Sequence, residues 1–170
     1  MKWVKYILLL LFFTSTLLGD SKITPTGLKL IKHYESLRLH SYLDAVNVWT
    51  IGWGTTKNVG PGMVINEKKA DELLTNDVLT FEVYVNKKIY RKMKWHEFDA
   101  SVSFTYNVGH IDGNLRNAMN TGNTKLVSYY FKKYVTGRIR GTNVRIVLPG
   151  LVKRRNTESK LYESGKLEFK

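Results

Sequence analysis

The 170-residue sequence contains no cysteine, only 3 prolines, and 14 acidic residues against 27 basic ones. The absence of cysteine excludes disulfide bonds, thiol catalysis and thiolate metal sites. The few prolines and the 12% of aromatic residues exclude a collagen-like or low-complexity chain. With 43% hydrophobic and 24% charged residues, the composition is that of a globular protein, and the length corresponds to about one domain.

The shortage of acidic residues leaves a net charge of +13. A balance this basic suits a polyanionic partner, which can be a nucleic acid, an anionic membrane face or a cell wall. Nine basic residues and a single acidic one, Glu158, fall within residues 132–160. We therefore expect a basic face that binds anionic wall polymer or an anionic membrane surface.

The first residues differ in composition from the rest. Lys2 and Lys5 precede an uncharged run at residues 7–18, and Gly19 follows it. A run of this length is typical of a signal peptide, whereas a spanning helix needs about 20 apolar residues. Residues 1–22 are therefore predicted to be a signal peptide or a signal-anchor segment, and residues 23–170 the functional domain. A buried core helix is disfavoured because the run lacks a polar face.

Export narrows the choice of partner. Removing residues 1–19 takes away two lysines and leaves a net charge of 13 − 2 = +11, so the basic character belongs to the domain. An exported protein is periplasmic or secreted, or is held on the membrane by its first segment. It does not meet the chromosome, so we expect the cell wall or lipid head groups as partner and no nucleic acid. We also expect a monomer.

Local signals predict an α+β chain that is mostly helical. Thr24 and Pro25 are typical of a helix start, and the spacing of apolar residues predicts a helix to about residue 35. Residues 41–43 and 48–51 are rich in strand formers and predict a hairpin around a turn at residues 44–47. Asn66 is expected to begin a long helix. Further helices are predicted at residues 95–106, 115–119, 126–134 and 152–162, with breaks at 137–141 and 149–150.

Three residues at the end of the first predicted helix and in the hairpin have the chemistry that hydrolysis of a glycosidic bond needs. Glu35 falls at the predicted helix end, Asp44 nine residues later at the hairpin turn, and Thr50 on the return strand. Glycosidic hydrolysis needs two carboxyl groups on opposite sides of the scissile bond, and a hydroxyl can hold the attacking water. Each residue alone also has an ordinary structural explanation, as a helix-end charge, a turn residue and a strand former. The spacing alone is therefore only a hypothesis.

Residues 35–56 resemble the active-site segment of the phage-type lysozymes and endolysins, glycoside hydrolase family 24. That segment has Glu, Asp nine residues on, Thr six further, and then Ile-Gly-aromatic-Gly, which stands here at residues 51–54. Residues 95–109 and 148–162 resemble the family's central and C-terminal helices. The resemblance covers about residues 24–165 and implies a lysozyme-like fold, in which an early β-hairpin lobe packs on a helical lobe.

The resemblance implies a muramidase that cleaves the β-1,4 bond between N-acetylmuramic acid and N-acetylglucosamine in peptidoglycan. It implies that Glu35 is the general acid and that Thr50 helps to orient the attacking water. It assigns Asp44 as the second carboxylate, which positions or activates that water and stabilises positive charge on the sugar. Attack by water in this way predicts inversion. No metal or organic cofactor is implied, and the four histidines show no metal-ligand spacing.

Two departures from the family pattern lie near these residues. The family often has His where this chain has Thr55, which changes how the base of the cleft is braced. The family often has Gly in the hairpin turn where this chain has Asn47. Asparagine tolerates a positive φ, so the second change is a mild one. Neither departure removes a residue that the reaction needs.

Other side chains are candidates for binding the sugar. Trp53 and Tyr106 can form stacking walls and Asn107 a polar contact, although aromatic residues at these spacings often belong to the core. One of Arg154 and Arg155 is expected to pair with a carboxylate of the cleft.

Three other functions stay open at this stage. A lytic transglycosylase cleaves the same bond without water, and Asp44 and Thr50 favour hydrolysis over it. A non-catalytic cationic protein that binds the wall or nucleic acid, or one that disrupts membranes, accounts for the charge alone. Glu35→Gln separates a hydrolase, which loses its activity, from nucleic-acid binding and membrane disruption, which survive the change. The products separate hydrolysis, which leaves a reducing end, from the transglycosylase, which leaves a 1,6-anhydro end.

Overall fold

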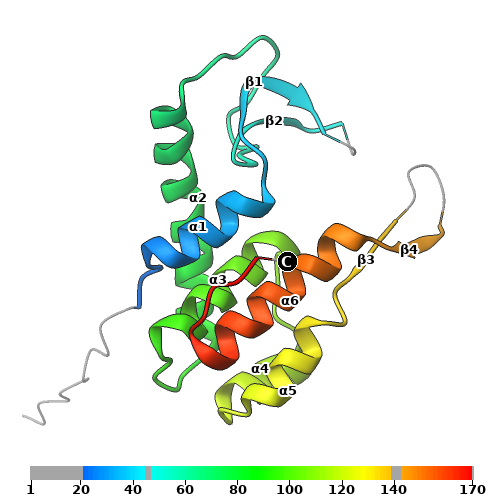
Figure 1. The fold of residues 1–170 in the computed structure, drawn as a ribbon. Coiled ribbons are helices and arrows are strands. Elements are labelled where there is room, and N and C mark those ends of the chain that lie inside the picture. Colours follow the sequence, from blue (N-terminus) through cyan, green and yellow to red (C-terminus); the bar gives the residue numbers. More distant parts are fainter. Residues whose placement is uncertain (1–20, 45–46, 139–142, 170) are drawn as a thin grey trace, which may run out of the picture.

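The computed structural model describes residues 21–44, 47–138 and 143–169. Helices dominate, and two separate two-stranded antiparallel hairpins accompany them (Figure 1). The helices are α1 (Pro25–Tyr34), α2 (Glu67–Lys88), α3 (Trp95–Val108), α4 (Gly113–Asn120), α5 (Thr124–Phe131) and α6 (Pro149–Ser164). The strands are β1 (Arg38–Leu43), β2 (Trp49–Gly52), β3 (Thr136–Arg138) and β4 (Arg145–Val147). This architecture confirms the predicted α+β class with mostly helical content.

Residues 1–20 of the predicted export segment lie outside the described residues. Among those that are described, no helix has both the length and the hydropathy needed to cross a membrane. Ser21, the first described residue, bonds through its backbone N–H and C=O to the side-chain amide of Asn86 on α2.

The helix ends follow the sequence signals. Thr24 caps α1, because its hydroxyl accepts a bond from the N–H of Thr26, and Pro25 takes the first helical position. Asn66 caps α2 through the N–H of Lys69 at 2.8 Å. Gly109 ends α3 with a φ of 84°, which is a left-handed conformation that glycine adopts easily.

Helix α3 forms the centre of the helical lobe. It contacts α1, α2 and α6, and every residue from 97 to 105 is buried. Figure 1 shows these three helices arranged around it. Phe98, Val102 and Phe104 lie in the core, while Ser101 and Thr105 donate their hydroxyls to carbonyls one turn earlier. A helix buried on all sides gives Tyr106 and Asn107, near its C-terminal end, a rigid support.

The β1–β2 hairpin forms the second lobe. Tyr42 pairs with Thr50, and an irregularity in the register bends β1 between Arg38 and Tyr42. Asn47 has a φ of 63°, so the predicted left-handed turn residue is confirmed. Glu35 ends the helix that precedes β1, and Asp44 directly follows β1.

The region between α5 and α6 differs from the sequence prediction. Residues 137–141 were predicted to be a break, and residues 139–141 lie outside the described residues. Residues 137 and 138 belong to β3, which pairs with β4 in a second hairpin that was not predicted. Leu148 packs over Gly137, where an added Cβ would lie 2.5 Å from the Leu148 side chain. The hairpin was missed because strands of three residues are too short to show an alternating pattern.

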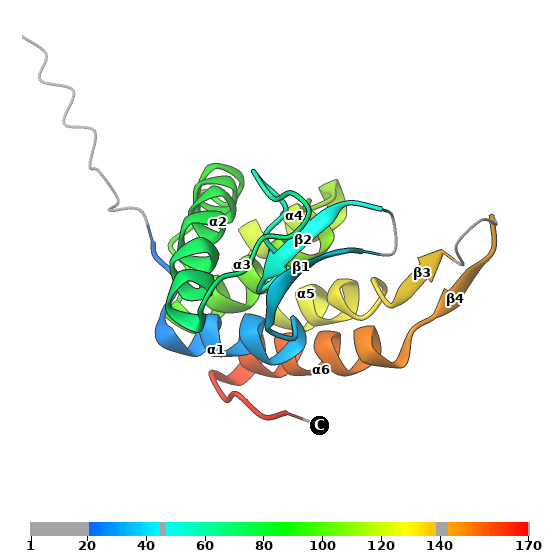
Figure 2. The same cartoon turned by 90° about the horizontal axis from the view of Figure 1, so that it is seen from above.

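Two helix boundaries were also wrong. Pro149 and Gly150, interpreted as a break, are the first residues of α6, because proline needs no N–H partner at a helix start. Helix α5 ends at Phe131 and does not reach residue 134. In both Figure 1 and Figure 2, the β3–β4 hairpin projects on the same side of the molecule as the end of the β1–β2 hairpin.

Candidate active site

Glu35 lies at the junction of the two lobes. It is the C-cap residue of α1, and its N–H donates to the carbonyl of Ile31 at 3.1 Å. The next residue, Ser36, has a positive φ of 33°, which turns the chain from the helix toward β1. The Glu35 side chain is partly buried, with 22% of its surface exposed. This position confirms that Glu35 falls at a helix end.

Arg154 of α6 pairs with Glu35. Its Nη1 lies 2.6 Å from Glu35 Oε1, although only 3% of the arginine side chain is exposed. Burial works against the charge of Arg154, but the carboxylates of Glu158 and Glu35 hold its pKa above the ordinary value. The expectation that one of two neighbouring arginines pairs with a cleft carboxylate is thus confirmed for Arg154.

A second buried carboxylate holds both arginines. Glu158 is fully buried, and its Oε1 accepts from Arg154 Nε at 3.0 Å and from the Ser103 hydroxyl at 2.7 Å. Its Oε2 accepts from Arg155, whose guanidinium also donates to the Asn107 side-chain oxygen. Burial lowers the pKa of Arg155. The result is a continuous network from Glu35 on α1 to Asn107 at the end of α3.

This network removes two cations from the predicted basic face. Arg154 and Arg155 are both buried, so the surface charge of residues 132–160 comes from the other basic residues in the described part of that stretch. In the sequence, Glu158 is the single acidic residue of residues 132–160. Its spacing of three and four residues from the two arginines is the helical signal that predicts their pairing.

Asp44 and Thr50 are both bound to the backbone of Val48. The Asp44 carboxylate accepts from the Val48 N–H at 2.9 Å, and the Thr50 hydroxyl donates to the Val48 carbonyl at 3.1 Å. Thr50 is buried, with 4% exposed. The structure thus brings Asp44 and Thr50 together around one residue of the hairpin. In the described part of the chain, Glu35 makes no hydrogen bond to either of them.

The second glycine of the Ile-Gly-aromatic-Gly segment, Gly54, allows the hairpin lobe to approach Glu35 closely. Gly54 has a φ of 99°, and a Cβ added there would lie 3.4 Å from Glu35 Oε2 and 3.6 Å from the Tyr106 hydroxyl. Tyr106 donates this hydroxyl to the carbonyl of Trp53 at 2.9 Å. Burial, and then the charges of Glu35 and Asp77, raise the pKa of Tyr106. Tyr106 is therefore a neutral donor beside the Glu35 carboxyl group.

Thr55 occupies the position where the lysozymes that this sequence resembles often have histidine. It is buried, and its hydroxyl donates to Asp77 Oδ2 on α2 at 2.6 Å. Its backbone also pairs with Ile51 in both directions. The predicted change in how the base of the cleft is braced thus takes the form of a hydroxyl–carboxylate hydrogen bond between the two lobes.

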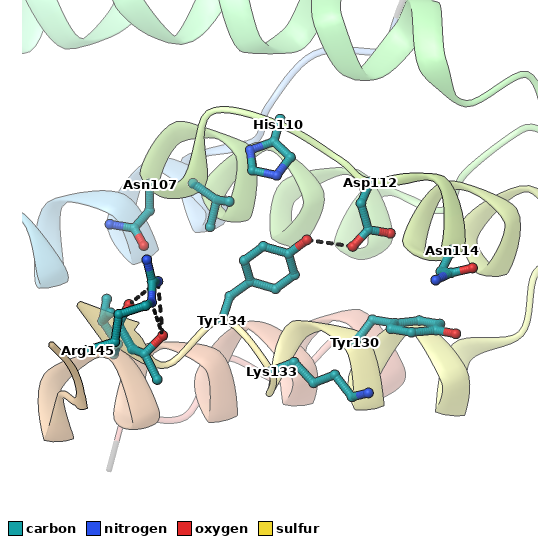
Figure 3. Close-up of a pocket in the computed structure, with 11 residues that line it drawn as sticks. Asn107, His110, Asp112, Asn114, Tyr130, Lys133, Tyr134 and Arg145 are labelled. Atoms are coloured by element: carbon teal, nitrogen blue, oxygen red, sulfur yellow. Dashed lines mark hydrogen bonds between the residues drawn. The ribbon is translucent and has the colours of Figure 1, made fainter. Parts of the chain in front are cut away.

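The three candidates for sugar binding lie in different surroundings. Tyr106 lines a cavity of about 330 Å³ next to Gly54 and Asp77. Asn107 lines a larger one of about 550 Å³ on the helical lobe (Figure 3). Trp53 is not among the residues that line either cavity. Its Nε1 donates to Asp71 at 2.8 Å, and Lys32 lies 5.2 Å above its ring.

The described side chains contain no group of three or more histidine and acidic residues that could hold a metal ion.

Comparison with known proteins identifies the family. The phage lysozyme family matches residues 32–158, which include Glu35, Asp44, Thr50 and Arg154. The chain belongs to this family. As a phage lysozyme family member it is an enzyme, and its activity is the hydrolysis of peptidoglycan.

Relatives support the family assignment over most of the length of this chain. The chain is 34% identical over 145 residues to an endolysin of Acyrthosiphon pisum secondary endosymbiont phage 1, and the match covers 84% of this chain and 98% of the relative. The structure of an endolysin from Escherichia coli O157:H7 phage FAHEc1 has a TM-score of 0.80 and 31% identity, covering 88% of this chain and 98% of the other. The muramidase domain of SpmX from Asticaccaulis excentricus has a TM-score of 0.76 and 28% identity, covering 84% and 98%. These likenesses confirm the predicted lysozyme-like fold.

Proposed function

We propose that this enzyme hydrolyses the β-1,4 bond between N-acetylmuramic acid and N-acetylglucosamine, with Glu35 as the general acid. The observation that carries the proposal is the fixed, partly buried carboxyl group of Glu35. Arg154 binds Oε1, whereas Oε2 lies on the side of Gly54 and Tyr106. The proton to be transferred therefore belongs on Oε2, from which it passes to the glycosidic oxygen as the bond breaks.

Asp44 and Thr50 are proposed to position the water molecule that attacks the sugar. Because the Thr50 hydroxyl donates its hydrogen to the Val48 carbonyl, its oxygen is oriented to accept a hydrogen bond from a water molecule. The Asp44 carboxylate, held by the Val48 N–H, positions or activates the same water and stabilises positive charge on the sugar. Since water attacks the face opposite the leaving group, we expect inversion at the anomeric carbon.

Sugar binding is assigned to Trp53, Tyr106 and Asn107. Tyr106 and Asn107 are consecutive, so the helical step of about 100° directs them into the two different cavities. The substrate chain is thus proposed to run from the Tyr106 side to the Asn107 side, past Glu35. Trp53 contributes through its carbonyl, which fixes the Tyr106 hydroxyl, and through its ring.

Residues 1–22 are proposed to export the catalytic domain of residues 23–170, as a cleaved signal peptide or as a membrane anchor. The exposed basic residues are proposed to hold the domain, as a monomer, against anionic wall polymer or membrane and not against nucleic acid. Cell fractionation of the full-length chain, with mass determination of its N-terminus, tests the export. A product that is cytoplasmic and starts at Met1 contradicts it.

The catalytic proposal is tested with the full-length chain and dye-labelled peptidoglycan. Glu35→Gln is expected to lower dye release by about 10²-fold or more, because the general acid is lost. Glu163→Gln, at an exposed site on α6, is the matched control. Nuclear magnetic resonance of the first products should show a reducing end in the inverted anomeric form. Products with 1,6-anhydro ends would instead support a transglycosylase, and equal release by Glu35→Gln would contradict the role of Glu35.

A further inference from the structure

The second hairpin places two arginines opposite each other. Arg138 on β3 pairs in register with Arg145 on β4, and both are exposed. Like charges directly opposite on an antiparallel pair are destabilising. No carboxylate within the described ranges forms an ion pair with either guanidinium. The hairpin therefore carries a concentrated positive charge that its described neighbours do not neutralise.

One of these guanidinium groups is held in place. Arg145 Nε and Nη2 donate to the Thr136 hydroxyl at 3.1 and 3.0 Å, and Nη2 also donates to the Thr136 carbonyl at 3.1 Å. These bonds lie on one side of the planar group and orient its remaining N–H donors. A guanidinium oriented in this way suits an oxyanion, because less side-chain entropy is lost when the anion binds.

Arg145 also forms part of the wall of the cavity of about 550 Å³ next to Asn107. Figure 3 shows the Arg145 guanidinium near Asn107, and Lys133 toward Tyr130 and Asn114. Besides these two cations, the wall consists of amide and hydroxyl groups, the imidazole of His110, the carboxylate of Asp112 and two apolar side chains.

The carboxylate of this cavity is already engaged. Asp112 accepts from the Tyr134 hydroxyl at 2.5 Å and from the Leu115 N–H at 2.8 Å. Burial works to raise its pKa, but these hydrogen bonds hold the pKa of the Asp112 carboxyl below its ordinary value. Lys133 and Arg145 supply two positive charges against this one negative charge, and amide and hydroxyl groups are also present, so the cavity suits a ligand that has amide groups and a negative charge.

We propose that the Arg138–Arg145 pair binds a carboxylate of the peptide stem attached to the glycan chain, with the stem lying in this cavity. The inference rests on the proposed function, because the stem is present only if peptidoglycan occupies the site. The N-acetylated sugars carry no charge apart from their attachment to the stem, whereas free stem carboxylates match the two guanidinium groups. The hairpin thus makes the enzyme selective for strands whose stems carry free carboxylates.

Selectivity is measured with soluble peptidoglycan fragments that have free stem carboxylates and with the same fragments after amidation of those carboxylates. For the full-length chain at low salt, we expect kcat/KM to be roughly three- to fivefold higher on the free form, as for an exposed ion pair. In the double variant Arg138→Gln and Arg145→Gln, the ratio should fall to near one. Arg116→Gln, an exposed arginine on α4, is the matched control and should keep the ratio.

A binding measurement separates this inference from the catalytic proposal. Synthetic stem peptide, with free or amidated carboxylates, is titrated into Glu35→Gln protein while the Arg145 Nε–H signal is followed by nuclear magnetic resonance. A shift with the free peptide alone supports the inference even if no hydrolysis is ever found. An unchanged activity ratio in the double variant overturns it and leaves the proposed hydrolysis intact. Inorganic phosphate that binds at the pair while the free peptide does not also overturns it.

Discussion

Arg154 on α6 and Glu35 at the end of α1 are 119 residues apart in the sequence and form an ion pair of 2.6 Å. The pair joins the last helix of the helical lobe to the residue from which the hairpin lobe begins. The position of the Glu35 carboxyl group therefore depends on Arg154 of another helix as well as on the conformation of the end of α1. Because Arg154 is buried, the position of the carboxyl group depends on the packing of α6 against α3.

Replacing Arg154 should affect stability and activity together. Arg154→Met leaves Glu158 buried with one arginine fewer, and breaking such a buried pair costs about 3–5 kcal/mol of unfolding free energy. Arg154→Lys keeps the charge but cannot bond to both carboxylates at once, so we expect a smaller loss. Urea unfolding and dye release measure the two effects. A methionine variant as stable and as active as the wild type would show that the pair has no positioning role.

Glu158→Gln tests the centre of the same network. It removes the charge that compensates Arg154 and Arg155, both buried, and should lower the unfolding free energy by about 3–5 kcal/mol. Glu163→Gln on the exposed side of α6 should change it by no more than about 0.5 kcal/mol. The comparison is made by urea unfolding of both variants. Equal stabilities would mean that the buried arginines need no carboxylate.

Gly54→Ala should damage the active site through the backbone. A side chain at a φ of 99° is strained by about 1–2 kcal/mol, and the new Cβ meets Glu35 Oε2 at 3.4 Å. We expect a lower kcat in dye release along with this loss of stability. Gly60→Ala is the control, because no atom lies within 4 Å of its added Cβ and its φ is not positive. If both alanine variants behave alike, the space next to Glu35 is not restricted.

Glu97 should make stability depend on pH in the acid range. It accepts from Arg91 at 3.1 Å and from the Lys94 N–H at 2.8 Å. Burial works to raise its pKa, but these bonds lower the pKa below the ordinary value of 4.5. A pKa that is lower in the folded state stabilises the protein above the unfolded value, and this contribution is lost as the pH falls through the folded value.

The measurement is urea unfolding of wild type and Glu97→Gln at several pH values. The wild type should be more stable at about pH 7, and the difference should shrink toward zero at about pH 2. A difference that stays constant over this range would mean that the charge of Glu97 does not contribute.

Local signals predicted the parts of the site that lie within one segment. The cap at Thr24 and the apolar spacing of α1 placed Glu35 at a helix end, and strand formers around a polar turn placed Asp44 and Thr50 on a hairpin. Asn47 was predicted to be left-handed because its side chain tolerates that conformation. These features depend on neighbouring residues only, so the sequence contains the information directly.

Contacts between distant segments were harder to predict. The sequence offered Arg154 and Arg155 as equal partners for a cleft carboxylate, and only the packing of α6 decides which of them reaches Glu35. The bond from Arg155 to Asn107 depends on how α3 and α6 cross, which no local pattern records. The β3–β4 hairpin was missed because a strand of three residues with Gly137 in its middle has no distinctive periodicity.

The hydrogen bond between Thr55 and Asp77 affects how the contact between the two lobes responds to pH. A histidine at this position would gain or lose a proton between about pH 5 and 8, and the attraction to Asp77 would change with it. A threonine hydroxyl stays neutral throughout that range, so the bond of 2.6 Å does not depend on a proton taken from solution. In an enzyme that acts on peptidoglycan, this link between the lobes therefore contains no histidine whose charge would change with the acidity of the medium.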